Sequence, residues 1–319
     1  MPASYIHICA ASDAILKWAP EDEKIDLNAV LAGAEGPDPL FYSFITKKGK
    51  QSLPELASLM HKTRTGAFLD ELAKNVGDSK LLKSYVYGFL SHYATDTVCH
   101  PYIFTKSFAD GKLSSNKHCK YEHAMETYVY RRKGFMAGLP KQLEGFAKLN
   151  GVEKKEIATF LTKAISKVFP EHPVSVAEIR KSFRDAVFFS KLLRSCALKK
   201  KSLILGIAKK LPIAGLVDSH LMVNLKPNAF DGALELSGFK WEDMLNRDHK
   251  EWRSPWEQDR PRTESFDELF GKAVDRTKEV MQGAKAFFDG KSPLEEFSAL
   301  HGDMSYDSGI PWEQTKALK

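Results

Sequence analysis

Apolar residues along the chain recur mostly at spacings of three and four positions, which is the period of an amphipathic helix. Alternating runs of β-branched residues, which would predict strands, are absent. The segments predicted to be helical are 6–16, 53–60, 68–72, 85–100, 121–130, 153–168, 176–197, 229–238 and 265–288. The pattern therefore predicts an all-α fold, a bundle of many helices.

Proline and glycine predict where some of these helices end. The segment 33–39 has prolines on both sides of Asp38, so we expect a stiff turn there. Pro101 directly follows His100, and we expect it to end the helix that begins near residue 85. The chain has no internal repeat, and its one weak boundary falls near residues 138–140.

Length and composition exclude several classes of protein. A chain of 319 residues with 43% hydrophobic and 28% charged residues has the composition of an ordinary globular protein. No apolar run approaches the roughly 20 residues that would span a bilayer. The four cysteines are scattered without a CxxC pair, which argues against a disulfide scaffold and a cysteine-only zinc module. The N-terminus lacks the pattern of a secretory signal, so we predict a reduced, cytoplasmic location.

The net charge of +6 is concentrated in one segment. Residues 171–210 contain ten Lys or Arg and three acidic residues. A solvated helix face explains such a run, and an anionic partner such as a lipid headgroup or nucleic acid explains it as well. Within it begins 198–211, an apolar stretch with lysines at both ends. This stretch could lie in a membrane interface or form a core helix, and the sequence leaves both hypotheses open.

Histidine placement is the most informative chemical feature. His92, Asp96 and His100 are spaced i, i+4 and i+8 on the helix predicted over 85–100. Each step of four residues turns only about 40° around a helix, so the three side chains share one face. His118 and Glu122 form a second i, i+4 pair of imidazole and carboxylate.

Imidazole nitrogen and carboxylate oxygen are the usual ligands of catalytic zinc. Several buried groups of this kind must either ligate metal or hydrogen-bond to one another, because burying them without partners is costly. The alternative to a metal site is therefore a buried hydrogen-bond network of the same groups. Other metal scaffolds fit less well: the chain has no His-Glu-x-x-His, no glutamate three residues before a histidine, and no His-Asp dipeptide.

One family has these residues in the same order. The order is His7, Gly36-Pro-Asp38-Pro, His61, Gly88-Phe-Leu-Ser-His92-xxx-Asp96-xxx-His100-Pro-Tyr and His118-xx-Tyr-Glu122. It resembles the zinc-dependent phospholipase C family, which shares an all-helical fold with the fungal zinc single-strand nucleases. The resemblance covers about residues 1–130. In the secreted bacterial members the second histidine of the helix motif lies six residues after the aspartate, whereas His100 lies four after Asp96.

The resemblance implies a phospholipase C-like bundle with two or three zinc ions in its core. It implies one zinc held by Asp38, His61, His92 and Asp96, and a second held by His100, His118 and Glu122. His7 would serve a third zinc, bridged by Asp96. Iron or manganese would accept the same ligands. We expect residues 1–138 to form the metal-binding core and residues 139–319 to add helices that complete or cover the same domain.

The function implied is hydrolysis of a phosphodiester by metal-activated water, with Asp38 as both ligand and catalytic base. The substrate would be a phosphoester, for example one with a phospholipid headgroup, and no stable nucleic-acid partner is expected. One alternative is a nucleotide or single-strand nucleic-acid phosphohydrolase on the same metals. Another is a non-catalytic helical protein with a structural metal.

Some further residues have competing interpretations. Cys9, Cys99 and Cys119 lie near predicted ligands, and we favour buried packing over thiolate ligation. Glu126 and His123 could hydrogen-bond to the ligand histidines. His249 lies among tryptophans and arginines that could bind a headgroup, but a loop anchored by Trp252 and Trp256 is the favoured interpretation. His172, His220 and His301 have no carboxylate at helical spacing that indicates a site.

Overall fold

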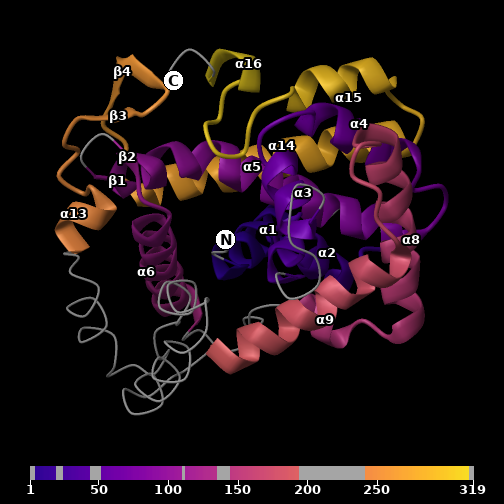
Figure 1. Cartoon of the computed structure of the whole chain (residues 1–319). Helices are drawn as coiled ribbons and strands as arrows, with labels where there is room; N and C mark the ends of the chain where they lie inside the picture. Colours follow the sequence, from indigo (N-terminus) through magenta and orange to yellow (C-terminus); the bar gives the residue numbers. More distant parts are fainter. Residues whose placement is uncertain are drawn as a thin grey trace.

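A computed structural model describes residues 4–18, 24–43, 52–109, 112–134, 144–193 and 241–315. Within these ranges the chain is mostly helical, which confirms the predicted all-α class (Figure 1). The helices are α1 (Ser4–Trp18), α2 (Leu27–Gly33), η1 (Asp38–Ser43), α3 (Leu53–Met60), α4 (Thr65–Lys74), α5 (Lys80–Ser107), α6 (Ser115–Gly134), α7 (Glu144–Lys148), α8 (Gly151–Val168), α9 (Val176–Leu193), α13 (Trp241–Leu245), α14 (Phe266–Phe288), α15 (Leu294–His301) and α16 (Trp312–Thr315). Two small antiparallel sheets pair β1 (Phe108–Ala109) with β2 (Lys112–Leu113), and β3 (Trp252–Ser254) with β4 (Glu257–Arg262).

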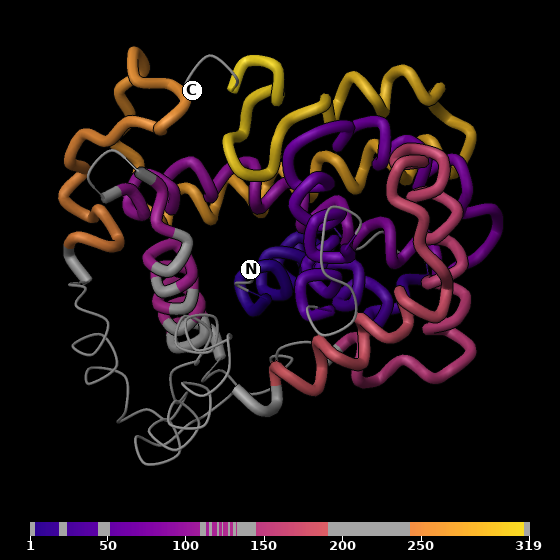
Figure 2. The backbone as a smooth tube through the Cα atoms, viewed as in Figure 1, coloured from indigo at the N-terminus to yellow at the C-terminus, as the bar shows by residue number. Residues whose placement is uncertain are grey.

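Helix α5 is the axis of the fold. It packs along α14 over much of its length, and α1, α2 and α6 contact it as well (Figure 1). In Figure 2 the indigo tube of α1 lies in the middle of the view, with the yellow C-terminal segment above it. Helix α2 approaches α5 so closely that a Cβ on Gly33 or Gly88 would lie 2.0 Å from a carbonyl oxygen of the other helix. Only glycine fits at this crossing, and the close approach brings the turn after α2 against the ligand face of α5.

Most of the predicted helices are confirmed. Predictions over 53–60, 153–168 and 265–288 match α3, α8 and α14 closely. The predicted turn at 33–39 is confirmed up to residue 37, and η1 begins at Asp38. The predicted boundary near 138–140, the helix over 229–238 and the stretch 198–211 lie outside the described residues. None of the helices that the model describes is long and apolar enough to cross a membrane.

The prediction that Pro101 ends its helix is wrong. Helix α5 continues through Pro101 to Ser107. A proline removes the hydrogen bond to the carbonyl four residues earlier, here that of Thr97. The backbone of Gly309 lies against this carbonyl, since a Cβ built on Gly309 would be 2.3 Å from the oxygen of Thr97. Packing of the C-terminal segment on α5 therefore stabilises the helix where its own ladder is broken.

The C-terminal segment 302–310 is bound firmly to the first half of the chain. Thr65 donates through Oγ1 to both the Asp303 carboxylate and the Met304 carbonyl, each at 2.8 Å. Tyr306 donates its backbone N–H to the His61 carbonyl at 2.7 Å, and the Ser305 hydroxyl donates to the same oxygen at 3.1 Å. These bonds hold the segment against the end of α3, beside the predicted ligands.

Two buried carboxylates hold the first turn of α1. Glu35 accepts a hydrogen bond of 2.6 Å from the Ser4 hydroxyl, and Glu126 accepts one of 2.7 Å from the backbone N–H of Tyr5. Burial raises the pKa of Glu35 to about 8, and the bond from Ser4 only partly offsets it. Glu126 therefore bonds to the helix that bears His7. This contact differs from the one considered from sequence.

The raised pKa of Glu35 predicts a pH-dependent stability. The folded state binds this proton more tightly than the unfolded state, so the contribution is present below about pH 4.5 and is lost as the pH rises toward 8. Relative to Glu35→Gln, the wild-type free energy of unfolding should fall by about 3 kcal/mol between about pH 5 and pH 8. Urea denaturation of both proteins in EDTA measures this difference. A difference that does not change with pH would contradict the buried carboxyl.

Candidate metal centre

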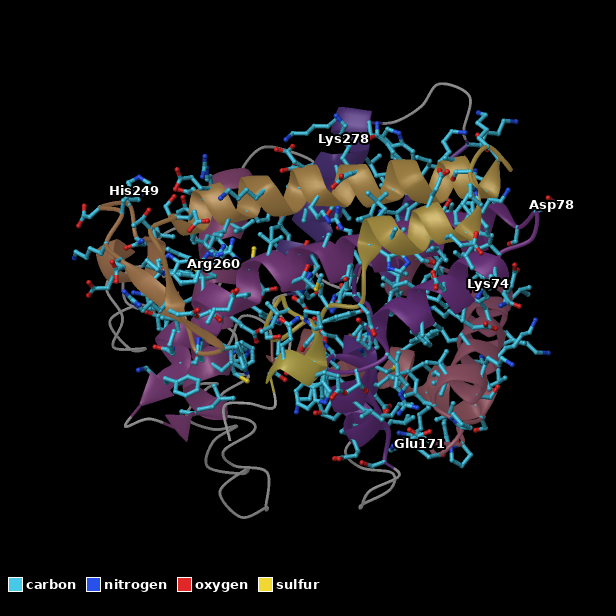
Figure 3. All side chains as sticks on the ribbon, turned by 90° about the horizontal axis from the view of Figure 1, so that it is seen from above. Lys74, Asp78, Glu171, His249, Arg260 and Lys278 are labelled. Atoms are coloured by element: carbon cyan, nitrogen blue, oxygen red, sulfur yellow. The ribbon has the colours of Figure 1, made fainter. Side chains whose placement is uncertain are left out.

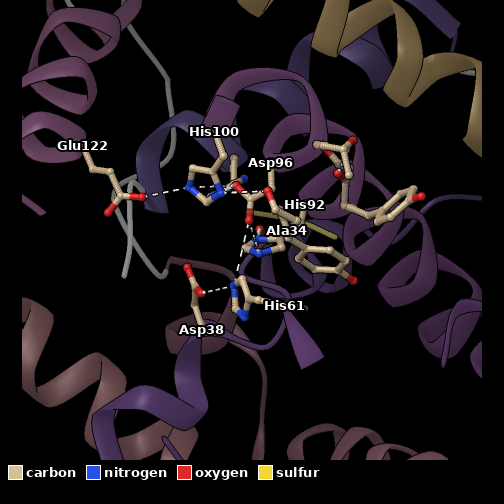
Figure 4. Close-up of polar contacts among 12 residues, drawn as sticks. Ala34, Asp38, His61, His92, Asp96, His100 and Glu122 are labelled. Atoms are coloured by element: carbon tan, nitrogen blue, oxygen red, sulfur yellow. Dashed lines mark hydrogen bonds and ion pairs between the residues drawn. The ribbon is translucent and has the colours of Figure 1, made fainter. Parts of the chain in front are cut away.

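All eight predicted ligands lie together in the interior, from five elements of the first half of the chain. His7 comes from α1, Asp38 from η1 and His61 from the residue after α3, while α5 and α6 bring the other five. Three groups have potential ligand atoms within 4.8 Å of one another. They are His7, His92 and Asp96; Asp38, His61 and His92; and His100, His118 and Glu122. Figure 4 shows six of these side chains pointing toward one another.

Asp96 is the centre of the cluster. Its Oδ1 lies 3.3 Å from Nε2 of His7 and 3.5 Å from Nε2 of His100. Its Oδ2 lies 3.1 Å from Nε2 of His92 and 3.9 Å from Nε2 of His61. One carboxylate thus faces histidines from all three groups (Figure 4). This is the arrangement expected of a bridging ligand.

Backbone carbonyls orient three of the histidines. In each ring Nδ1 faces a carbonyl oxygen and Nε2 faces a carboxylate. The pairs are His92 with Ala34 (3.1 Å), His61 with Ala57 (2.8 Å) and His100 with Tyr306 (3.1 Å). A carbonyl only accepts, so Nδ1 must be the donor. In a neutral ring Nε2 then presents its lone pair to the cluster, as metal-ligating histidines do.

A cation fits between these groups. Nε2 of His92 and Oδ2 of Asp96 are buried and 3.1 Å apart, yet neither makes a hydrogen bond to any described group. A neutral His92 and an ionised Asp96 would place two lone pairs opposite each other, which is unfavourable unless a proton or a metal ion lies between them. The donor set of imidazole nitrogen and carboxylate oxygen is one that zinc accepts.

The pKa shifts of the ligand side chains without metal agree with this interpretation. Burial lowers the pKa of His100, but Asp96 and Glu122 outweigh burial and raise it to about 9. Asp96 likewise raises the pKa of His92 against the effect of burial. Burial alone would raise the pKa of Asp96, but the surrounding histidines hold it well below its usual range. His7 is the exception, because burial and His92 lower its pKa to about 3.

A cavity of about 110 Å³ reaches the cluster. Six of the eight predicted ligands line it, and four other residues complete its wall: Phe41, Ser58, Lys62 and Asp307. Sequence reasoning missed these four, and it also missed Tyr306. The ring of Tyr306 packs edge-on against His61 at 5.2 Å, while its carbonyl orients His100. No sequence signal connects Tyr306 and Asp307 to ligands about 200 positions earlier.

Comparison with known proteins adds independent evidence. The family model described as zinc dependent phospholipase C matches residues 6–174, just over half of the chain. The chain belongs to the zinc-dependent phospholipase C family. Comparison with curated proteins and with solved structures gave no significant match. Family membership and the buried ligand groups together support a metal-dependent phosphoesterase that binds zinc.

The family match ends at residue 174, but the site includes residues beyond it. Tyr306 and Asp307 lie in the segment 302–310, beyond residue 174. Asp307, which lies outside the matched region, thus forms part of the wall of the metal-site cavity.

The cysteines lie outside the ligand groups. Among the described residues, none of the three groups of potential ligands includes a cysteine. Cys9, Cys99 and Cys119 are buried, and burial raises the pKa of the Cys119 thiol to about 11. This agrees with the packing role favoured from sequence.

The tryptophan and arginine loop is an anchor rather than a wall of the cavity. Trp252 is buried and donates through Nε1 to the Glu264 carbonyl at 3.0 Å. Figure 3 shows His249 at the outer edge of the molecule, and its side chain is 53% exposed. Neither residue lines the metal-site cavity.

His301 is also buried, but it belongs to none of the ligand groups. Its Nε2 lies 3.0 Å from Oδ1 of Asp70.

The raised pKa values predict that zinc binding releases protons. Without metal, His100 with its pKa of about 9 keeps an extra proton at neutral pH. Zinc needs the lone pair of Nε2, so it must displace that proton. Zinc affinity should therefore rise by up to about tenfold per pH unit between about pH 6 and pH 9 for each proton released. Titration calorimetry in two buffers of different ionisation enthalpy measures this release. His249→Ala should behave as wild type, and an affinity independent of pH would contradict the prediction.

A glycine beside His92 offers a specific test of the ligand geometry. Gly36 and Gly77 both have φ of +53°, so alanine is strained at either position. A Cβ on Gly36 would lie 2.4 Å from the His92 ring, whereas a Cβ on Gly77 would meet nothing within 4 Å. Each alanine variant should lose about 1 kcal/mol of stability from backbone strain. Only Gly36→Ala should also lose bound zinc, measured by mass spectrometry of metals. Equal zinc content in the two variants would show that His92 is not a ligand.

Proposed function

We propose that the chain is a multinuclear zinc phosphodiesterase that hydrolyses its substrate with a metal-activated water. The observation that supports this most directly is the cavity that reaches six predicted ligands. A structural zinc site is closed by its protein ligands, whereas a catalytic site leaves a position open for water or substrate. The open cavity favours the phosphodiesterase over the alternative of a non-catalytic protein with a structural metal.

The eight ligands would hold two or three zinc ions. His100, His118 and Glu122 would hold one ion, as expected from the family resemblance. Asp38, His61 and His92 would hold another, and Asp96 would bridge toward His7. Zinc at these positions would lower the pKa of a bound water and offset charge on the phosphoryl oxygens. Iron or manganese would suit the same ligands.

Asp38 is the proposed catalytic base. One of its oxygens lies 3.1 Å from Nε2 of His61, and the side chain lines the cavity. Burial opposes its ionisation, but the contacts with His61 and His92 together outweigh burial and keep the pKa of Asp38 below its usual value. The other oxygen is then available to orient the attacking water and accept its proton. Attack on phosphorus in line with the leaving group forms one P–O bond, breaks another and releases an alcohol.

The size of the cavity bears on the substrate. A volume of about 110 Å³ suits a phosphoryl group with water, but not a whole lipid. The leaving alcohol would therefore lie outside the cavity, as a phospholipid would require. Membrane contact through 198–211 and a cytoplasmic location remain predictions, as does the absence of a stable nucleic-acid partner. We also propose that 139–319 completes the domain formed by 1–138, which the packing of α14 on α5 supports.

A nucleotide or single-strand nucleic-acid substrate is the second candidate. Phe41 lines the cavity, is only partly buried, and its ring lies 5.3 Å from that of His61. An aromatic ring in this position could stack on a base. Phe41→Ala should reduce hydrolysis of a dinucleotide more than that of an aliphatic phosphodiester if this candidate is correct.

The proposed function is tested by removing the bridging carboxylate. Asp96→Asn should lose most bound zinc, because a neutral amide cannot replace the negative charge of the carboxylate among the histidines. Mass spectrometry of metals measures the zinc content. Hydrolysis of bis(p-nitrophenyl) phosphate should fall by more than about 100-fold, since loss of an outer partner alone costs about 10- to 100-fold. Asp70→Asn is the matched control, because Asp70 also pairs with a buried histidine but lies in no ligand group. Less than one zinc per wild-type chain, or equal activity in both variants, would refute the proposal.

A further inference from the structure

Two charged side chains in the wall of the metal-site cavity belong to none of the three ligand groups. Lys62 and Asp307 both line the cavity, and both are partly exposed. Neither makes an ion pair or a side-chain hydrogen bond within the part of the chain that the structure describes. An unpaired ammonium and an unpaired carboxylate at the mouth of a reaction cavity are therefore candidates for contact with the substrate.

The backbone explains why these two residues lie together. The His61 carbonyl accepts hydrogen bonds from the backbone of Tyr306 and from the Ser305 hydroxyl. Lys62 directly follows His61, and Asp307 directly follows Tyr306. The two charged residues therefore lie next to each other, although 245 positions separate them in the sequence. No ion pair joins them, so Nζ of Lys62 and the carboxylate oxygens of Asp307 lie more than 4 Å apart. The ammonium and the carboxylate therefore remain available to the substrate.

We propose that Lys62 and Asp307 are specificity-determining residues, and that together they select monoanionic phosphodiesters over dianionic phosphomonoesters. This inference rests on the proposed function. The ammonium of Lys62 donates to a non-bridging phosphoryl oxygen, as a lysine does at many phosphate sites. The carboxylate of Asp307 repels a second negative charge on the substrate. A phosphodiester has one such charge, whereas a phosphomonoester has two at neutral pH.

Repulsion is a necessary part of this selection. Metal ions and a lysine attract any phosphate, and they attract the dianion more strongly than the monoanion. Discrimination against the dianion therefore needs a group that disfavours it, which is how specific sites commonly exclude a close competitor. Asp307 is the one acidic residue lining the cavity that lies outside the three ligand groups.

The test uses steady-state kinetics of the zinc-loaded, full-length protein with two esters. These are bis(p-nitrophenyl) phosphate, a diester, and p-nitrophenyl phosphate, a monoester. Lys62→Met should lower kcat/KM for the diester by about 10- to 100-fold, the range for a hydrogen bond to a charged group. Lys62→Arg should restore most of it. Asp307→Asn should raise the ratio of monoester to diester kcat/KM by roughly three- to tenfold, because it removes one like charge.

Two controls separate substrate contact from a structural role. Zinc content should match wild type in all of these variants. Inorganic phosphate, tested as a competitive inhibitor, should bind more weakly to Lys62→Met and more tightly to Asp307→Asn. Lys74→Met changes an exposed lysine on α4, at the outer edge of the molecule in Figure 3, and should leave both kcat/KM values unchanged.

The outcomes distinguish this inference from the function on which it rests. A zinc-loaded wild type that hydrolyses neither ester refutes the phosphodiesterase, and this inference with it. An active wild type with an unchanged ester ratio in Asp307→Asn, or unchanged kcat/KM in Lys62→Met, overturns the inference and leaves the phosphodiesterase standing. Zinc loss in either variant also overturns it, because the residue then supports the ligands and does not contact substrate.

Discussion

The buried negative charge of Asp96 is the constraint on which the site depends. Transfer of an isolated carboxylate into a protein interior is very costly, so its charge must be balanced by groups in direct contact. Four imidazole rings surround Asp96, from α1, from the end of α3 and from α5, and the protons or metal ions that these rings bind balance its charge. These elements must therefore pack together to neutralise the charge of Asp96, as well as to bury the apolar core. A metal cluster balances the charge more completely than protons do, because each ion bonds several ligands at once.

How far the sequence predicts this site depends on the distance between the residues involved. His92, Asp96 and His100 are predictable from spacing alone, because the helix period is a local property of the chain. The pair of His118 and Glu122 is predictable for the same reason. Asp38, His61 and His7 are isolated in sequence, so their place in the cluster follows only from the family resemblance.

Other features could not be predicted because they arise from contacts between distant segments. Helix α5 continues through Pro101, where the backbone of Gly309 packs against it, and the carbonyl of Tyr306 orients His100. A rule about proline describes local sterics and contains no information on a segment that packs on the helix 200 residues later. The residue before a proline is biased away from helix, but tertiary packing overrides that bias here. Helices α3, α8 and α14 were predicted closely, whereas α2 and α15 were not predicted.

The orientation of the ligand rings by carbonyl oxygens has a consequence for how this site tolerates change. The oxygens of Ala34, Ala57 and Tyr306 belong to the main chain, so no replacement of those side chains removes the acceptor itself. The path of the backbone, and not any orienting side chain, therefore fixes the direction in which these three imidazole rings point. Substitutions that leave this path intact should be tolerated, whereas an insertion or deletion that shifts the 302–310 segment by a single residue should misalign the ring of His100. The lengths of the connecting segments are therefore part of the ligand geometry.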